Sequence, residues 1–466
     1  MAYIFRIESY PPVGVGINID LNVVDTWSPT VSATNDVIIE SIPIIISGTD
    51  DDDQAANLQD LQRMIDDARY YEQEPSAYDG QELWLVWQTA DETNSKRRLI
   101  RSASIAFDNG PWFNCGEGNM ALNIRATLSL GVNGWWERST STPVIPSGTI
   151  IATMMQPVTV GDIPGDAFAR MEKLDIRGKI AAPRKDAYDV YVGMRSTRRH
   201  DDLANFVPIW EIEDGAVIAG TDTSAVIEAG ASPNAAANNS HETTFATLPA
   251  FSGRSVIYFN DVTANFSDNY GRYLVMWRGK TDAGTECTVR VDSVLSGNDI
   301  LIPGETFEVD SGGDWIVMET GLIVTLPVVI GKTALVVPEE YGFAIYAGRD
   351  AGAGSFFTDC LLLIPIDEYF LKYNWPITGL VALPTSAAVR IAIGPDETES
   401  ALLYDYATTV PRDVTPPVTE GYGMPIGDTE AYFVITEGLN GEHVFTNELF
   451  IDIWYIPRYH SLRGAD

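Results

Sequence analysis

In this 466-residue sequence, the residues that could perform chemistry, judged by their type and spacing, are aspartates and glutamates that lie close together. A glycosidase needs two carboxyl groups a few ångströms apart, one acting as an acid and the other as a base or nucleophile. Two sets have suitable spacing: Asp359 with Asp367 and Glu368, and Glu211 with Glu213 and Asp214. The chain has 65 acidic residues, so such sets also arise by chance. We therefore interpret these carboxylates as solvated acids on loops and strand edges, and predict no catalytic residue.

Other catalytic, metal-binding and cofactor-binding motifs are missing from the sequence. No GxSxG elbow, Walker loop or Rossmann glycine pattern lies between a strand and a helix. Cysteines and histidines are too scattered for a zinc site: Cys115, Cys287, Cys360, His200, His241, His443 and His460. We interpret the cysteines as buried or partly buried free thiols. The prediction is a protein that is not an enzyme and has neither a cofactor nor a metal.

Basic residues gather in two short places. They are a predicted hairpin loop with Lys96, Arg97 and Arg98, and a run that contains Arg195, Arg198, Arg199 and His200. On an acidic protein such patches can pair with acidic patches of a neighbouring subunit and fix the register between copies. Solvated loops are the alternative interpretation, so these residues are candidate interface residues.

Tryptophans offer a second set of candidate contacts. Trp112, Trp135 and Trp136 flank strand ends, where large apolar residues serve either subunit contacts or the core. Trp84 and Trp87 fall on opposite faces of a strand, so we expect one to be buried and one to be exposed or at an interface. Most of the later tryptophans lie within apolar strands and are expected in the core, with ligand stacking as the alternative: Trp210, Trp277, Trp315, Trp375 and Trp454.

The elements that must position these residues are mostly strands. Apolar and polar residues alternate with a period of two, as in residues 119–130, and this pattern indicates half-buried antiparallel strands. Short strands separated by turn residues continue to the end of the sequence, which is typical of sandwiches.

One segment has helical spacing. Over residues 54–72, Leu58, Leu61, Ile65 and Ala68 recur at intervals of three and four, which predicts an amphipathic helix. The acidic run before it suits a helix N-terminus, where carboxylates cap free N–H groups, better than it suits a calcium loop.

Composition excludes several classes of partner. With 30 basic and 65 acidic residues the net charge is −35, so a general basic surface for nucleic acid is excluded and an anionic membrane would repel the chain. The longest aliphatic runs fall short of the roughly 20 residues of a membrane helix. The first residues lack a basic leader followed by an apolar stretch, so we expect no secretory signal and synthesis in a cytoplasm.

The first third of the sequence resembles a known family. Strands are followed by SGTDDDD and the predicted helix, then by ELWLVWQT, a hairpin and a strand that ends in LSLGVNGWWE. This order is similar to the N-terminal domain of distal tail proteins, the baseplate-hub subunits of long-tailed bacteriophages. The resemblance implies a ring, of six copies in that family, that joins the tail tube to host-facing parts of the virion tail.

The later part resembles the carbohydrate-binding jelly rolls that are often appended to tail proteins. Residues 207–220, 271–280 and 288–295 are similar to strands at the start and in the middle of such modules. In those modules an early pair of glutamates often touches a structural ion, and Glu211 and Glu213 occupy comparable places. Alternation along a strand explains this pair equally well, so any contact with a host glycan or ion there is a weak expectation.

These patterns predict a mainly β fold: an N-terminal β-sandwich with one α-helix, followed by one or two jelly-roll-like β-sandwiches. The predicted parts are a ring-forming sandwich (1–138), a Ser/Thr/Pro linker (139–148), a second sandwich (149–374) and C-terminal strands (375–466) that could complete another sandwich, with strands interleaved in sequence. The predicted function is that of a structural virion protein at or near the tail tip, in contact with its own copies and other tail proteins. The alternative is a carbohydrate-binding or carbohydrate-cleaving protein.

Overall fold

The structure is a computed structural model of the chain. It describes residues 3–10, 18–24, 27–31, 37–73, 82–89, 95–107, 124–138, 142–145, 150–152, 155, 157–178, 187–200, 203, 206, 208–211, 216–217, 225–227, 243–245, 257–258, 270–295, 299–326, 342–374, 387–393, 399–405, 412–413, 418–421, 423–437 and 448–462. Strands dominate this part of the chain and form antiparallel sheets, with a single long helix, so the predicted mainly β class is confirmed. No helix in these ranges is long and apolar enough to cross a membrane.

The N-terminal unit is built from six strands and the helix. They are β1 (Tyr3–Tyr10), β2 (Asn18–Leu21), β3 (Ile38–Ile46), α1 (Asp51–Gln73), β4 (Glu82–Thr89), β5 (Ser95–Phe107) and β6 (Ile124–Val132). The order β2-β1-β4-β5 forms one sheet, and β3-β6-β5 forms a second path. The long β5 belongs to both because its register against β6 shifts between Ile100 and Ser102. A single bent strand therefore holds the two halves of this unit together.

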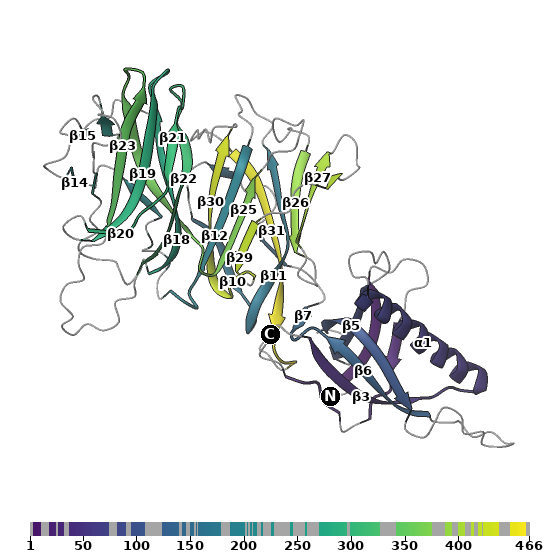
Figure 1. The fold of residues 1–466 in the computed structure, drawn as a ribbon. Helices are drawn as coiled ribbons and strands as arrows, with labels where there is room; N and C mark the ends of the chain where they lie inside the picture. Colours follow the sequence, from purple (N-terminus) through teal and green to yellow (C-terminus); the bar gives the residue numbers. More distant parts are fainter. Residues whose placement is uncertain are drawn as a thin grey trace, which may run out of the picture.

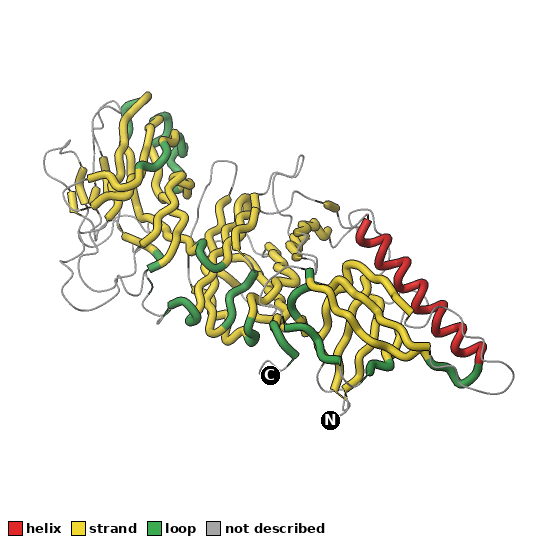
Figure 2. Tube along the Cα trace, turned by 60° about the horizontal axis from the view of Figure 1, so that its bottom comes forward, coloured by secondary structure: helices red, strands yellow, loops and turns green. Residues whose placement is uncertain are grey.

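Helix α1 confirms the predicted helix and its cap. The Asp50 carboxylate accepts a hydrogen bond from the Asp53 N–H at 2.8 Å, and the Asp53 carboxylate accepts one from the Thr49 N–H at 2.8 Å. This reciprocal capping satisfies N–H groups that have no partner in the first turn. The helix buries Leu61, Met64, Ile65 and Ala68 in the core that the two sheet paths share. Figure 2 shows the helix along one side of the N-terminal unit.

A middle sandwich contains strands from both sides of a long insertion. Its first sheet continues the N-terminal sheet through β7 (Trp136–Arg138) in the order β5-β7-β31-β11-β26-β27-β28, with β8 and β9 also paired to β31. Its second sheet has the order β10-β30-β12-β25-β29. The bounds are β8 (Thr142–Ile145), β9 (Ile150–Ala152), β10 (Pro157–Ile163), β11 (Ala167–Gly178), β12 (Ala187–Ser196), β25 (Tyr369–Asn374), β26 (Ala387–Ile393), β27 (Glu399–Asp405), β28 (Arg412–Asp413), β29 (Val418–Gly421), β30 (Gly427–Glu437) and β31 (Glu448–Tyr459).

The outer sandwich is inserted between β12 and β25. Its two sheets have the orders β15-β16-β24-β18-β22, with β13 paired to β24, and β14-β17-β23-β19-β20, with β21 paired to β19. The bounds are β13 (Ile209–Glu211), β14 (Ala216–Val217), β15 (Ala225–Ile227), β16 (Thr243–Phe245), β17 (Ile257–Tyr258), β18 (Gly271–Thr281), β19 (Glu286–Leu295), β20 (Asp299–Ile302), β21 (Thr306–Val309), β22 (Ile316–Leu326), β23 (Gly342–Ala351) and β24 (Phe356–Pro365).

The three units follow one another in space, with the middle sandwich between the other two (Figure 1). Strands on both sides of residue 374 share the sheets of the middle sandwich, because β11 pairs with β26 and β31, and β12 pairs with β25 and β30. The sheets therefore do not separate residues 149–374 from residues 375–466. The chain makes two connections between the middle and outer sandwiches, one leaving β12 and one entering β25.

Candidate functional site: polar clusters at the two junctions

The contact between the N-terminal unit and the middle sandwich, here called the inner junction, is centred on Glu137 of β7. Both carboxylate oxygens of Glu137 accept hydrogen bonds from Arg170 of β11 at 2.9 Å, and one accepts a third from Arg458 of β31 at 3.0 Å. Glu137 is 1% exposed. Burial alone would raise its pKa, but the facing guanidinium groups outweigh burial and lower the pKa to about 2. The carboxylate is therefore ionised throughout the neutral range.

The inner junction lies on one continuous sheet. Strand register places Arg6, Val86 and Arg97 side by side, then Glu137, then Arg458, across five adjacent strands. The Arg458 guanidinium also lies 4.0 Å from the centre of the Trp135 ring. Opposite charges on neighbouring strands of one face stabilise the pairing, so the charged row helps to hold the two units in register.

Most of the predicted interface residues of the N-terminal unit lie inside this junction. Lys96 and Arg98 are buried in β5, so the prediction that they lie in a hairpin loop was wrong. Arg98 pairs with Glu40 at 2.7 Å and lies over the Trp136 ring, while Lys96 donates to the Leu462 carbonyl oxygen. The physical reason is that these basic side chains satisfy buried carboxylates and carbonyls of the same chain.

The tryptophans follow the same trend. Trp135 and Trp136 are buried, and Trp112 lies outside the described residues. Trp84 and Trp87 point to opposite faces of β4 as predicted, but both are buried, so the expectation of one exposed ring was wrong. On the face of β4 that carries Trp84, the Arg97 guanidinium lies over the indole ring, 4.2 Å from its centre. Among the later tryptophans, Trp210, Trp277 and Trp315 are buried as predicted, Trp454 is partly buried, and Trp375 lies outside the described residues.

The contact between the middle and outer sandwiches, here called the outer junction, is centred on Glu368 in the connection from β24 to β25. Its carboxylate accepts hydrogen bonds from the Ser196 N–H at 2.5 Å and from the Ser196 hydroxyl at 2.8 Å. The Glu368 side chain is 0% exposed. Burial raises its pKa to about 7, although the hydrogen bonds from Ser196 oppose the shift. This acid therefore titrates near neutrality.

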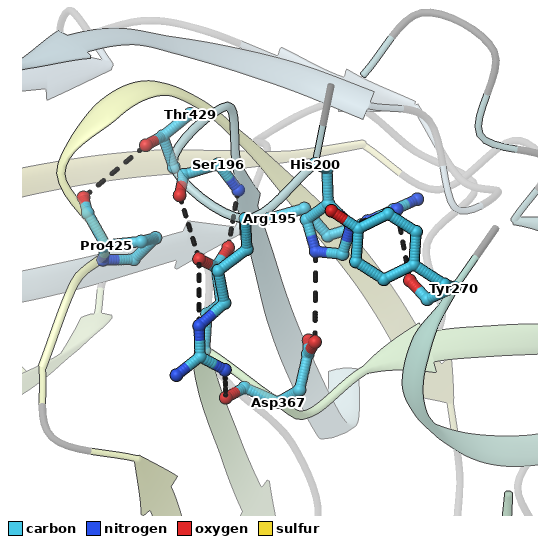
Figure 3. Close-up of polar contacts among 9 residues, drawn as sticks. Arg195, Ser196, His200, Tyr270, Asp367, Pro425 and Thr429 are labelled. Carbon is cyan, nitrogen blue, oxygen red and sulfur yellow. Dashed lines mark hydrogen bonds and ion pairs between the residues drawn. The ribbon is translucent and has the colours of Figure 1, made fainter. Parts of the chain in front are cut away.

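Asp367 and His200 complete the outer junction (Figure 3). The Arg195 guanidinium donates to His200 Nδ1 at 2.7 Å, so the neutral ring carries its proton on Nε2, which lies 3.8 Å from the Asp367 carboxylate. Burial and the charges of Arg195 and Arg199 lower the pKa of His200 to about 3. Burial raises the pKa of Asp367. Arg199, on the exposed turn after β12, donates to the Asp367 carbonyl oxygen at 3.0 Å.

A second polar group crosses the outer junction. Tyr191 of β12 donates a hydrogen bond to Glu319 of β22 at 2.6 Å, and Lys372 of β25 forms an ion pair with the same carboxylate. Burial raises the pKa of the neighbouring Asp189 to about 6. Apolar contact is continuous here as well, because Tyr191, Phe370, Tyr432 and Val434 of the middle sandwich belong to the hydrophobic core cluster of the outer one.

In the first predicted carboxylate set, Asp359 and Glu368 have separate partners. Asp359 of β24 is buried and pairs with Arg278 of β18, so its interpretation as a solvated acid was wrong, as it was for Glu368. The charge of Asp359 is satisfied inside the outer sandwich. The backbone of Glu211 pairs with Cys360, whereas its side chain, Glu213 and Asp214 lie outside the described residues.

The remaining predicted residues are placed as follows. Cys287 and Cys360 are free and buried, as predicted, and Cys115 lies outside the described residues. Arg198 and Arg199 are exposed on the turn after β12, with the Arg198 guanidinium 5.8 Å from the Phe168 ring. Within the described part of the chain, no group of three or more His, Cys, Asp or Glu side chains could hold a metal ion.

Sequence reasoning missed the residues that make the inner junction. Arg170 and Arg458 lie 33 and 321 residues from Glu137, and no local pattern marks such pairs. The outer junction left a partial signal, since Arg195, Arg199, His200, Asp367 and Glu368 were all singled out as charged residues. The topology that brings these two segments together was not predicted.

Comparisons with known proteins add little to this description. Neither the family models nor the curated proteins match the chain. Among solved structures, the chain is similar to the N-terminal CBM22-1–CBM22-2 tandem domain of Xyn10C from Paenibacillus barcinonensis, with 9% identity and a TM-score of 0.21. The match covers 59% of this chain and 99% of that one. So weak a likeness carries no argument about function, and the fold defines the chain only as a protein of several β-sandwiches.

Proposed function

We propose that the chain is a structural subunit of a phage-type tail, at or near the tip, whose N-terminal unit assembles into a ring and carries the two sandwiches outward. The location in a tail rests on the resemblance of the first third of the sequence to distal tail proteins. The assembly rests on exposed aliphatic side chains of the N-terminal unit.

The observation that supports self-assembly is an apolar patch on the N-terminal unit. Val31, Val37 and Ile39 are 69%, 53% and 67% exposed. Val37, just before β3, and Ile39, within it, lie two residues apart and share one face of the strand, while the Thr30 N–H, next to Val31 in the chain, donates to Glu40 of β3 at 2.9 Å. Clustered exposed aliphatic side chains mark interaction surfaces. We assign this patch to a second copy of the chain.

The charged side chains at the two junctions support a structural role. Glu137, Arg170 and Arg458 join the N-terminal unit to the middle sandwich, and the groups around Glu368 join the middle sandwich to the outer one. Ion pairs and hydrogen bonds between neighbouring units hold the units in a fixed orientation and can carry force from one unit to the next. A net charge of −35 also suits the wall of a DNA conduit, because like charge would repel passing DNA.

The experiment that tests the proposal measures the mass of the full chain by light scattering and its shape by electron microscopy. We expect ring-shaped particles of several copies, which Ile39→Lys dissociates because it buries a charge in the apolar contact. The matched control is Ile323→Lys, an exposed isoleucine of β22 in the outer sandwich, which should leave the particles intact. A chain that stays monomeric at all concentrations would contradict the proposal.

The competing hypothesis of a carbohydrate-cleaving protein gives a different outcome. Its best acid among the described residues is Glu368, whose pKa lies near 7 as a general acid requires. That hypothesis predicts polysaccharide hydrolysis that Glu368→Gln abolishes. The structural proposal predicts no hydrolysis by either form, because the Glu368 side chain is fully buried.

A further inference from the structure

A pocket of about 200 Å³ lies on the N-terminal unit, on the outer face of β1, β4 and β5. Its lining alternates along each strand, so the side chains share one face of the sheet. The residues are Arg6, Glu8, Trp84, Val86, Gln88, Ser95 and Arg97. Helix α1 packs against the other face, where it contacts the core that contains Leu85 and Trp87.

The register orders the lining into three rows. Arg6, Val86 and Arg97 form the central row, Glu8 and Trp84 lie on one side of it, and Gln88 and Ser95 lie on the other. Val86 and Trp84 give the pocket an apolar floor. Side chains that both donate and accept hydrogen bonds stand at its rim.

Trp84 is held in place by one residue outside the pocket lining, Glu82, and by one within it, Arg97. The Trp84 indole N–H donates to Glu82 at 3.2 Å, and the Arg97 guanidinium lies over the ring. A fixed aromatic residue with an apolar neighbour and a ring of polar groups is the arrangement that small-molecule sites use, with the apolar area giving affinity and the polar groups giving orientation.

Charge compensation within the lining favours a neutral ligand. Arg6 pairs with Glu8 at 3.2 Å and with Asp20 at 3.4 Å, and Arg97 lies next to Glu137 across the sheet. Neither guanidinium group therefore leaves an uncompensated positive charge, and the net charge of −35 repels anions. The ligand must instead exchange many neutral hydrogen bonds and offer one apolar face.

The volume of the pocket narrows the class of ligand further. The pocket has room for about seven water molecules, which is below the range of drug-sized sites and corresponds to a single ring. A pyranose combines hydroxyl groups around its edge with an apolar face of C–H groups. We propose that this pocket binds one neutral pyranose unit, a property that does not depend on where the protein acts or on its assembly.

The test is saturation-transfer difference NMR on the full chain with the methyl glycosides of glucose, galactose and mannose. At least one glycoside should show saturable transfer, and sorbitol, which has the hydroxyl groups without the ring, should show none. Gln88→Ala should weaken binding about fivefold to tenfold through lost hydrogen bonds, and Ser95→Leu, which fills the pocket, should abolish it. Gln62→Ala, an exposed glutamine of α1, is the matched control and should bind like the wild type.

Three results would overturn the proposal. One is the absence of saturable transfer from all three glycosides to a wild-type chain that unfolds cooperatively. Another is binding that Gln88→Ala and Ser95→Leu leave unchanged, which would place the sugar elsewhere on the chain. The last is tighter binding of methyl glucuronide than of the neutral sugars, which would mean that the arginines select an anion.

Discussion

The inner and outer junctions both bury charged side chains, but they compensate them in opposite ways. At the inner junction one carboxylate, Glu137, meets two guanidinium groups in direct hydrogen bonds, and its pKa falls to about 2. At the outer junction Glu368 receives hydrogen bonds from neutral donors, its distance to Arg199 is 3.9 Å, and its pKa rises to about 7.

The difference shows what decides the behaviour of a buried acid. Both side chains are almost fully buried, so desolvation alone would raise both pKa values. Only a close and well-directed positive charge reverses the shift. The inner junction is therefore insensitive to pH across the neutral range, whereas the outer junction changes its protonation within it.

The largest effect expected from this comparison comes from Glu137→Gln. The variant leaves Arg170 and Arg458 buried without their carboxylate, and breaking a buried ion pair in this way costs about 3–5 kcal/mol. The free energy of unfolding, measured by chemical denaturation, should fall by that amount at pH 7. Glu308→Gln, the same change at an exposed position of β21, is the control. A loss no larger than that of the control would mean that the ion triad does not stabilise the inner junction.

The contrast between the junctions also marks the limit of sequence reasoning. The helix, its acidic cap and the alternation of the strands are local, and they were predicted correctly. The partners of Glu137 come from strands far away in sequence, and the sheet order that unites them depends on the whole chain. Lys96 and Arg98 were misplaced for a related reason: charged residues after a turn-like stretch resemble a loop, and only the buried partners Glu40 and Leu462 reveal why they belong to a strand.

The next largest effect concerns His200, whose behaviour opposes that of Glu368. The pKa of His200 is lowered to about 3 in the folded chain, below its ordinary value of 6.5, so its contribution to stability is lost as pH falls below 6.5. The contribution of Glu368 to stability increases as pH falls over the same range, because the folded chain binds the proton of this carboxyl group more tightly than the unfolded chain does. Between pH 6.5 and pH 5 the two effects oppose each other, at roughly 1–2 kcal/mol each, and the raised pKa of Asp189 adds to the gain from Glu368.

His200→Gln should remove the contribution that opposes Glu368. The glutamine carbonyl can still accept the hydrogen bond from Arg195, but it does not titrate. The variant should therefore gain about 1–2 kcal/mol more stability than the wild type between pH 6.5 and pH 5, measured by chemical denaturation at each pH. His460→Gln, at the residue that follows β31, should behave like the wild type. Profiles of equal slope for His200→Gln and the wild type would show that His200 does not carry a lowered pKa.

The smallest expected effect comes from Glu368 between pH 8 and pH 6.5, where His200 is mostly neutral in both the folded and the unfolded chain. The pKa of Glu368 is raised above its ordinary value of 4.5 to about 7, so the stability from this group is fully present below pH 4.5 and is lost as pH rises through 7. Between pH 8 and pH 6.5 the wild type should gain about 1 kcal/mol of stability, and Glu368→Gln, which cannot titrate, should lose this gain.

Hydrogen exchange shows where in the chain this stability is gained. Backbone amides of residues 190–196 and 369–374 should become better protected in the wild type on acidification, after correction for intrinsic rates. Amides of residues 136–138 and 452–458, at the inner junction, should not change, since Glu137 stays ionised throughout. Equal changes at both junctions would mean that the acid acts on the whole fold, and the distinction between a fixed inner and a titrating outer junction would fail.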